Sequence, residues 1–205
     1  MAPKPTVAPM EKAANAYHHG DLRAALIAAA RHVLETARPE AITLKSLAHR
    51  LGVSQPAPYR HFASRDALLA AVAADGFERF RDALVAARDG ARENEAFLKS
   101  CLAYLEFARA NRGVYRLMFA SQLLREADDE ALDRAASAAF DFLLEGAARI
   151  APPERVRAIA VWIWSTLHGL AMLEAAGLAG GPPGADLGSA EVVREMMATL
   201  GGHGG

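Results

Sequence analysis

The chain has 205 residues, of which 52% are hydrophobic and 23% charged. This composition is typical of a folded globular protein and excludes a chain that is disordered throughout, and the length suffices for one or two domains with a sizeable core. The net charge is −1, but residues 1–70 hold nine Lys and Arg against five Asp and Glu, so a weakly cationic N-terminal part precedes an acidic remainder. This asymmetry indicates an anionic partner for the N-terminal part.

The N-terminal residues 1–17 contain three prolines and no apolar run long enough for a secretory signal, so we expect a mobile arm. The single cysteine, Cys101, has no partner for an intramolecular disulfide, which favours a reducing, cytoplasmic location. The longest uncharged stretch, residues 158–173, is shorter than the run of about 20 apolar residues that spans a bilayer. We therefore expect no membrane partner. No His and Cys residues have the spacing of a zinc site, and we expect no metal and no cofactor.

Helical periodicity begins after this arm. Apolar residues recur at helical spacing over residues 21–37, which predicts a first helix. The Arg38-Pro39 step should end it, because a residue before proline is disfavoured in the helical conformation. Thr43 is placed to cap a short second helix, and Gly52 to end that helix with a positive φ.

A third helix is expected to begin three residues later. Ser54 is its predicted N-cap, Pro56 lies in its first turn, where a missing N–H costs little, and the helix should run through Phe62. Ser64 is then placed to cap a long helix over residues 64–87. Two short helices separated by a glycine turn and a new cap are typical of a helix-turn-helix.

The rest of the chain also predicts helices. No segment shows the period-two alternation of a strand, so the fold class is all-α. The expected helices lie at about 93–110, 112–120, 128–149, 154–176 and 189–200.

A family resemblance rests on the second and third predicted helices. Residues 42–69 read ITLKSLAHRLGVSQPAPYRHFASRDALL. Their combined Thr, Leu-Ala, Gly-Val-Ser and Tyr-Arg-His-Phe spacing closely resembles the DNA-binding region of the TetR family of bacterial transcriptional repressors, and the likeness covers residues 18–72. In addition, Trp164, His168 and Gly169 look like the Trp-His-Gly signature of one subgroup of C-terminal domains.

The resemblance implies a domain organisation and a set of partners. It implies a mobile arm over 1–17, a helix-turn-helix DNA-binding domain over 18–64, an effector-binding and dimerisation domain over 65–200 and a disordered tail over 201–205. The implied protein is a homodimer that binds double-stranded operator DNA. A small, largely apolar effector releases it from a palindromic operator, and coupling passes through the helix that begins at Ser64.

The candidate base-reading residues lie at the start of the third predicted helix. Gln55 can pair bidentately with adenine, whereas Pro56 and Ala57 can make only apolar contacts, for instance with a thymine methyl. Hydroxyl and cationic side chains around them are candidates for phosphate contacts, and Tyr59 and His61 carry over from the family motif. Pro58 stands where the family usually has a plain apolar residue. The full DNA-binding set is Thr43, Lys45, Ser54, Gln55, Pro56, Ala57, Tyr59, Arg60, His61 and Arg65.

The C-terminal part supplies two further sets of candidates. Aromatic residues at helical spacing are expected to line the effector cavity, with Glu106 and Arg109 as its polar groups if they point inward. This effector set is Phe80, Phe97, Tyr104, Phe107, Tyr115, Phe119 and Phe140. The last two helices present more apolar surface than a soluble monomer exposes, which predicts a four-helix dimer interface. This interface set is Ile159, Ile163, Leu167, Leu170, Val193, Met196 and Met197.

Other functions fit parts of the pattern. A structural three-helix domain would bury the same apolar positions, and a helix-turn-helix activator, an architectural factor or an all-helical ligand carrier remain alternatives. We expect no enzyme, because no nucleophile elbow, phosphate-binding glycine loop or His-Glu-x-x-His motif occurs in the sequence. His18 and His19 are expected to be solvated rather than to bind DNA or a metal, and His168 to be a hydrogen-bonded packing residue.

Overall fold

The computed structural model describes residues 22–119, 129–178 and 188–201, and every regular element in these ranges is a helix. Short 3₁₀ turns lie at Pro39–Ala41, Pro58–Arg60 and Pro153–Arg155. The predicted arm with His18 and His19, and the predicted tail beyond Gly201, lie outside the described residues. The α-helices are α1 (Leu22–Leu34), α2 (Leu44–Leu51), α3 (Arg65–Ala86), α4 (Glu93–Ala110), α5 (Arg112–Met118), α7 (Glu130–Ala148), α8 (Val156–Ala175) and α9 (Ser189–Gly201).

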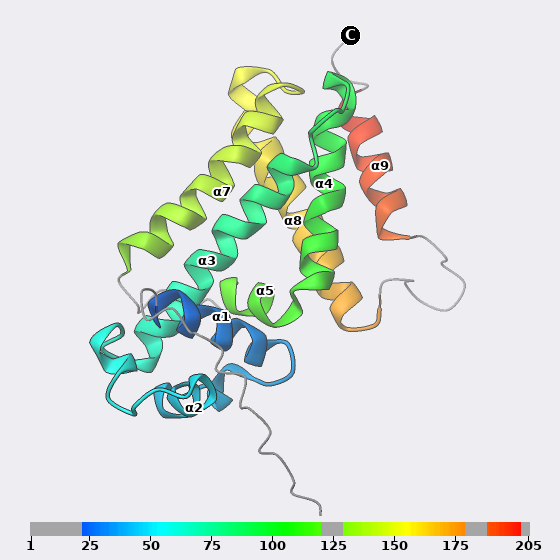
Figure 1. The fold of residues 1–205 in the computed structure, drawn as a ribbon. Coiled ribbons are helices and arrows are strands. Elements are labelled where there is room, and N and C mark those ends of the chain that lie inside the picture. The colour runs from blue at the N-terminus through cyan, green and yellow to red at the C-terminus, as the bar shows by residue number, and fades with distance from the viewer. Residues whose placement is uncertain (1–21, 120–128, 179–187, 202–205) are drawn as a thin grey trace, which may run out of the picture.

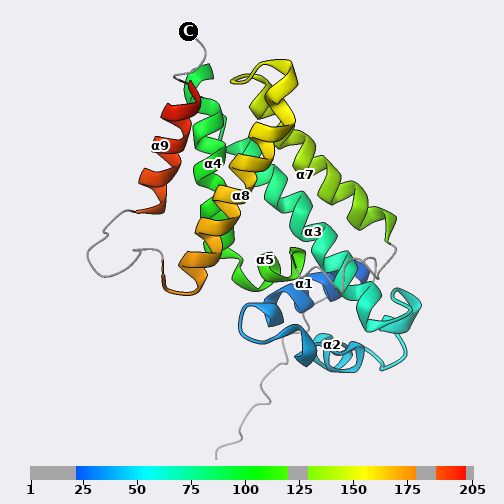
Figure 2. The same ribbon diagram turned by 180° about the vertical axis from the view of Figure 1, so that it is seen from behind.

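The helices form a small head and a larger body that share one core. Helices α1 and α2 make the head at one end of the molecule, and α3 runs from the head into the body, where it packs against α4, α5 and α7 (Figure 1). Helix α8 packs on α4 and α7, and α9 lies against α4 on the side away from α7 (Figure 2). A continuous cluster of buried side chains joins head and body, and α3 is buried on both its head and body segments.

The predicted caps Thr43 and Ser64 and the predicted glycine end of α2 are confirmed. Thr43 Oγ accepts a hydrogen bond from Ser46 N at 3.0 Å, and Ser46 Oγ accepts one from Thr43 N at 3.2 Å, so the two residues form a reciprocal capping box. Gly52 ends α2 with a φ of 67°, a left-handed conformation that favours glycine. Ser64 Oγ accepts from Ala67 N at 3.0 Å and caps α3.

The predicted third helix is wrong in its form. The structure has a turn followed by the 3₁₀ turn Pro58–Arg60 in place of an α-helix from Ser54 to Phe62. The physical reason is Pro58, which has no N–H to donate to Ser54 O, the bond that would close the first α-helical turn. The backbone instead makes i→i+3 bonds from Ala57 N to Ser54 O and from Arg60 N to Ala57 O.

The predicted dimer interface also needs correction, because much of it lies inside one chain. Helix α8 packs a buried side onto α4 and α7, and α9 packs onto α4, so the side chains on these packed sides keep little exposed surface for a partner. The predicted residues buried in this way are Ile159, Ile163, Leu167, Val193 and Met196, while Leu170 and Met197 are partly buried.

The opposite side of α8 is exposed and apolar. Its large exposed side chains include Trp162 in the first half of the helix and Met172 and Leu173 near its end, and Val161, which also lines the cavity described below, is exposed beside Trp162. The segment Pro153–Ala175 is long and apolar enough to span a membrane by length and composition. Its buried side, however, belongs to the protein core.

Candidate nucleic-acid interface and ligand cavity

The predicted DNA-reading side chains lie on one exposed end of the head. Gln55 and Pro56 are exposed in the turn after α2, and Ala57 is half-buried beside them. Tyr59 is 57% exposed although it is a large aromatic residue, which leaves its hydroxyl available to an anionic partner. The remaining exposed members of the predicted DNA-binding set are Thr43, Lys45, Ser54, Arg60 and His61.

Arg65 has a structural role that the sequence did not suggest. Its Nη2 donates to Pro39 O at 2.6 Å and its Nε to Ile42 O at 3.0 Å, while Nη1 pairs with Asp66 at 3.1 Å. These bonds attach the start of α3 to the segment between α1 and α2. Arg65 therefore fixes the head on α3, and its predicted phosphate contact would have to use the donors that remain.

The body contains a mostly apolar cavity of about 480 Å³ among α3, α4, α7 and α8, and Phe119, the residue after α5, also lines it. This volume lies within the range of about 300–1,000 Å³ of small-molecule sites. Members of the predicted effector set in the cavity wall are Phe80, Phe97, Tyr104, Phe119 and Phe140. Further wall residues are Phe77, Leu84, Ser100, Cys101, Ala136, Ala139, Phe142, Leu143, Arg157, Val161, Trp164 and Leu167.

Two members of the predicted effector set do not line the cavity. Phe107 packs edge-on against Phe80 with ring centroids 5.2 Å apart, and so supports the wall from behind. Tyr115 is buried on α5, where its hydroxyl lies 2.8 Å from that of Tyr104. Both residues pack against aromatic residues of the cavity wall. Helical spacing alone could not distinguish them from the residues that line the cavity.

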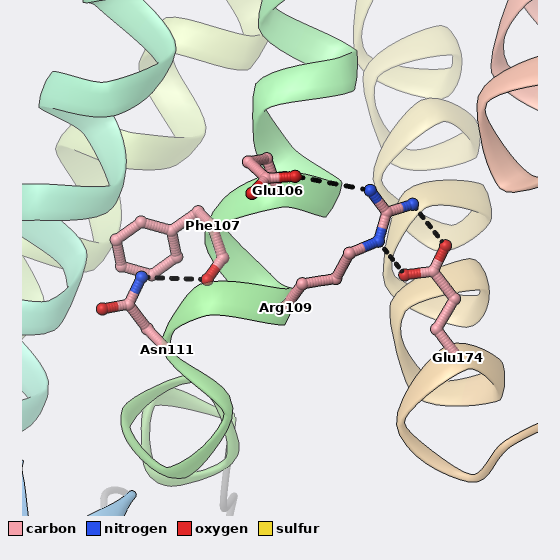
Figure 3. Close-up of polar contacts among 5 residues, drawn as sticks. All are labelled: Glu106, Phe107, Arg109, Asn111 and Glu174. Atoms are coloured by element: carbon pink, nitrogen blue, oxygen red, sulfur yellow. Dashed lines mark hydrogen bonds and ion pairs between the residues drawn. The ribbon is translucent and has the colours of Figure 1, made fainter.

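The predicted polar groups of the cavity point elsewhere. Arg109 is exposed and makes a bidentate ion pair with Glu174 on α8, through Nη2 at 2.6 Å and Nε at 2.7 Å (Figure 3). Glu106 pairs with the same guanidinium at 3.5 Å. The hydrogen bonds from Arg109 lower the pKa of Glu174 and keep that carboxylate ionised. The pair therefore joins α4 to α8 at the surface and contributes nothing to the cavity.

A buried hydrogen-bonded chain joins α4, α5 and α8. The Tyr115 hydroxyl lies 2.8 Å from the Tyr104 hydroxyl and 2.7 Å from His168 Nδ1. Burial lowers the pKa of His168 and raises that of Tyr104 to about 12, so all three groups are neutral at pH 7. The tautomer of the neutral imidazole sets the direction of the bond between His168 Nδ1 and Tyr115, because the Tyr115 hydroxyl has a single hydrogen to donate. The prediction that His168 is a hydrogen-bonded packing residue is confirmed.

Helix α5 also touches the head directly. Gly113 N donates to Glu35 Oε2 at 3.3 Å, and a Cβ at Gly113 would lie 2.0 Å from Leu34 O. The backbones of α5 and the end of α1 are thus in contact through a residue that has no side chain. Because Phe119, at the other end of this segment, lines the cavity, the segment joins cavity to head.

The sequence missed the contribution of α8 to the cavity. Trp164 and Leu167 were assigned to the signature and the dimer interface, yet both line the cavity, as does Arg157. The high apolar content of α8 on all sides hides which face packs inward. Among the described residues, no group of His, Cys, Asp and Glu side chains could hold a metal ion.

Comparison with known families agrees with this two-part organisation. A family model for bacterial regulatory proteins of the tetR family matches residues 26–72, which contain the head and the start of α3. A model for the C-terminal domain of tetracyclin repressor-like proteins matches residues 97–200, about half of the chain. The chain belongs to the TetR family. It is therefore a transcriptional regulator whose TetR head binds DNA through its helix-turn-helix.

Solved structures show the same fold. A protein of unknown function from Rhodococcus sp. RHA1 is 34% identical, with a TM-score of 0.76 over 91% of this chain and 96% of that chain. A TetR-family regulatory protein from Rhodococcus RHA1 is 21% identical, with a TM-score of 0.62 over 87% and 96%. A TetR variant from Acinetobacter baumannii AYE, in complex with minocycline, is 22% identical, with a TM-score of 0.58 over 85% and 93%. No curated protein matches the chain.

Proposed function

We propose that this TetR-family regulator is a cytoplasmic, homodimeric repressor that leaves a palindromic operator when a small, largely apolar effector occupies the cavity. The observation that supports this proposal is that two of the helices that line the cavity, α3 and α8, also carry surfaces that could contact DNA or a second copy of the chain. Helix α3 carries the reading head at its start, and α8 carries the exposed apolar face. An occupant of the cavity thus touches both the element that positions the head and the element that positions a second copy.

Release requires that the effector prefer one conformation. An effector with equal affinity for the DNA-bound and DNA-free forms would shift nothing, and reciprocity requires that DNA lower effector affinity by the same factor. The two routes to the head are α3, through Phe77 and Phe80, and α5, through Phe119 and Gly113. We propose that the signature residues Trp164, His168 and Gly169 take part in the route through α5. The rings of Phe119 and His168 lie 4.7 Å apart and so connect α8 to this route.

The exposed face of α8 favours a second copy of the chain. Trp162 is 45% exposed, and Val161, Met172 and Leu173 are exposed to a similar degree. Ser165 and Thr166 lie between these two groups of apolar side chains, but several large apolar side chains exposed on one helix still favour an interface with another protein surface. A two-fold dimer places two reading heads on half-sites about 34 Å apart, one DNA turn, so the operator should be a pseudo-palindrome.

We expect Trp162→Glu to convert the dimer to a monomer, because the substitution places a charge on the apolar face that dimerisation would remove from water. The matched control is Ser137→Glu on the exposed, polar side of α7, which should leave the dimer intact. Sedimentation velocity at micromolar concentration measures both variants. A stable monomer in the unsubstituted chain would overturn the dimer proposal.

Gln55 and Lys45 should have separable effects on DNA binding. Gln55→Ala should weaken binding to the preferred operator by about 1–3 kcal/mol and relax preference at one base position. Lys45→Ala should weaken all sequences by similar amounts and reduce the salt slope by about one. Gel-shift titrations over a set of operator variants at two salt concentrations measure both effects. A changed base preference in Lys45→Ala would contradict these roles.

A reporter assay separates the repressor from the activator. The operator is placed over the promoter of a reporter gene, and expression is compared with and without the protein. Lower expression with the protein supports repression, and higher expression supports the alternative of an activator. A chain that binds cavity ligands but gives no salt-dependent operator shift would instead be a ligand carrier.

A further inference from the structure

One end of the cavity has a cation behind its wall. Arg88, two residues after α3, donates from Nε to Ser100 Oγ at 3.0 Å. The centre of its guanidinium lies 3.8 Å from the ring centroid of Phe142. Ser100 and Phe142 both line the cavity, so the charge stands directly behind two wall residues.

Arg88 has a donor without an acceptor. Its Nη2 atom is buried and has no hydrogen-bond partner among the described residues. Nη2 is the nitrogen trans to Cδ, so one of its hydrogens runs parallel to the Nε–H that points to Ser100. A buried N–H without a partner is costly, and an oxygen atom brought to this edge removes the cost.

The positive charge at this end is not balanced within the wall. Burial and Arg149 lower the pKa of Arg88, and Glu145 and the thiol of Cys101 act in the opposite direction. Arg157 also lines the cavity. Among the described residues no Asp or Glu lines it, so the cavity as a whole attracts an anion.

We propose that the effector is an amphipathic organic acid whose carboxylate lies at Ser100, with its charge stabilised by Arg88. The Ser100 hydroxyl accepts from Arg88 and donates to Leu84 O at 3.0 Å, and its hydrogen can turn to a ligand oxygen instead. The apolar body of the acid occupies the aromatic end formed by Phe77, Phe119 and Trp164. This assignment rests on the proposed function only in taking the cavity as the effector site.

Matched pairs of ligands test the proposal on a chain with one tryptophan. The sequence has two tryptophans, so Trp162→Phe leaves Trp164 in the cavity wall as the fluorescent reporter. The probes are 1-naphthoate against 1-naphthamide and decanoate against decanamide, which differ within each pair only in the acid group. We expect each acid to bind at least tenfold more tightly than its amide. Equal binding within both pairs, or no binding of either acid at millimolar concentration, overturns the proposal.

Variants then locate the anion site. Arg88→Met should bring the acid-to-amide ratio close to one while the amides still bind, and Arg88→Lys should restore part of the preference. Arg155→Met, an exposed arginine outside the cavity wall, is the matched control and should keep the full ratio. Loss of the preference in Arg157→Met with its retention in Arg88→Met would place the anion at the other cation and overturn the assignment. If Arg88→Met does not fold, Ser100→Ala and Arg88→Lys decide between these outcomes.

Operator binding is measured separately on the chain that keeps both tryptophans, because Trp162 lies on the proposed dimer face. Acids that bind with the expected preference but leave operator affinity unchanged contradict the proposed repressor release and leave the acid site intact. Release by the neutral amides with no preference for acids contradicts the acid site and leaves the repressor proposal intact.

Discussion

Gly113→Ala should destabilise the protein by about 2–3 kcal/mol, the cost of forcing extra volume into a packed contact. The new Cβ would lie 2.0 Å from Leu34 O and 2.3 Å from Leu34 C, and these are backbone atoms that cannot rotate away. The ends of α1 and α5 would have to separate. For a chain of this size such a loss lowers Tm by about 5–10 °C.

The same substitution should weaken operator binding, because it loosens the head on the body. Arg112→Ala, at an exposed neighbouring position of α5, is the matched control and should change stability by less than about 0.5 kcal/mol. Urea unfolding and operator titration of the two variants give the comparison. Unchanged stability in Gly113→Ala would mean that the contact between α1 and α5 can widen without cost. That result would contradict the proposed coupling from the cavity to the head through α5.

Gly146→Ala should close the cavity from inside. A Cβ at Gly146 would lie 2.1 Å from Phe97 Cε2 and 2.5 Å from Phe97 Cδ2, in the side chain of a residue that lines the cavity. A side chain can move where a backbone cannot, and the open space beside the Phe97 ring is the cavity itself. The gain of about 1 kcal/mol in helix propensity offsets part of the packing cost.

Stability should therefore change little while the cavity shrinks. Cys101 lies one helical turn after Phe97 and lines the same cavity, so its rate of labelling by benzyl methanethiosulfonate reports access. We expect at least a tenfold slower rate in Gly146→Ala. Asp141→Ala, at an exposed position on α7, should label at the original rate. Equal rates in the two variants would show that Phe97 does not move into the cavity.

Local sequence chemistry predicted the elements well. The Thr43 and Ser64 caps and the positive φ of Gly52 are confirmed because each depends on interactions within a few residues. The prediction of an α-helix from Ser54 to Phe62 was wrong, although the residue that prevents this helix, Pro58, could be read from the sequence. A proline in the first turn of a helix is tolerated, but one at the fourth position removes the bond that closes that turn.

Tertiary packing decided what the sequence could not. Helix α8 is apolar on several faces, so periodicity does not distinguish Ile163, which is buried, from Trp162, which is exposed. In the same way a charged pair such as Arg109 and Glu174, 65 positions apart, cannot be paired from one sequence. The cavity residues on α4 were predicted because they are aromatic, and Ser100 was missed because a lone serine has no distinguishing pattern.

Cys101 offers a test of release that needs no knowledge of the effector. It is the single cysteine of the chain and lines the cavity. Burial raises the pKa of its thiol to about 12, so the thiolate fraction and the labelling rate should rise about tenfold for each pH unit between pH 7 and 9. Labelling at pH 9 with benzyl methanethiosulfonate attaches one benzylthio group inside the cavity, and mass spectrometry confirms a single addition.

The decisive measurement is the operator affinity of this labelled chain. If occupation of the cavity releases DNA, the labelled protein should remain a folded dimer and bind the operator at least tenfold more weakly than the unlabelled protein. Reduction of the disulfide should restore binding, and Cys101→Ala treated with the same reagent should bind as the untreated variant does. A singly labelled, folded dimer that binds the operator as tightly as before would contradict the account.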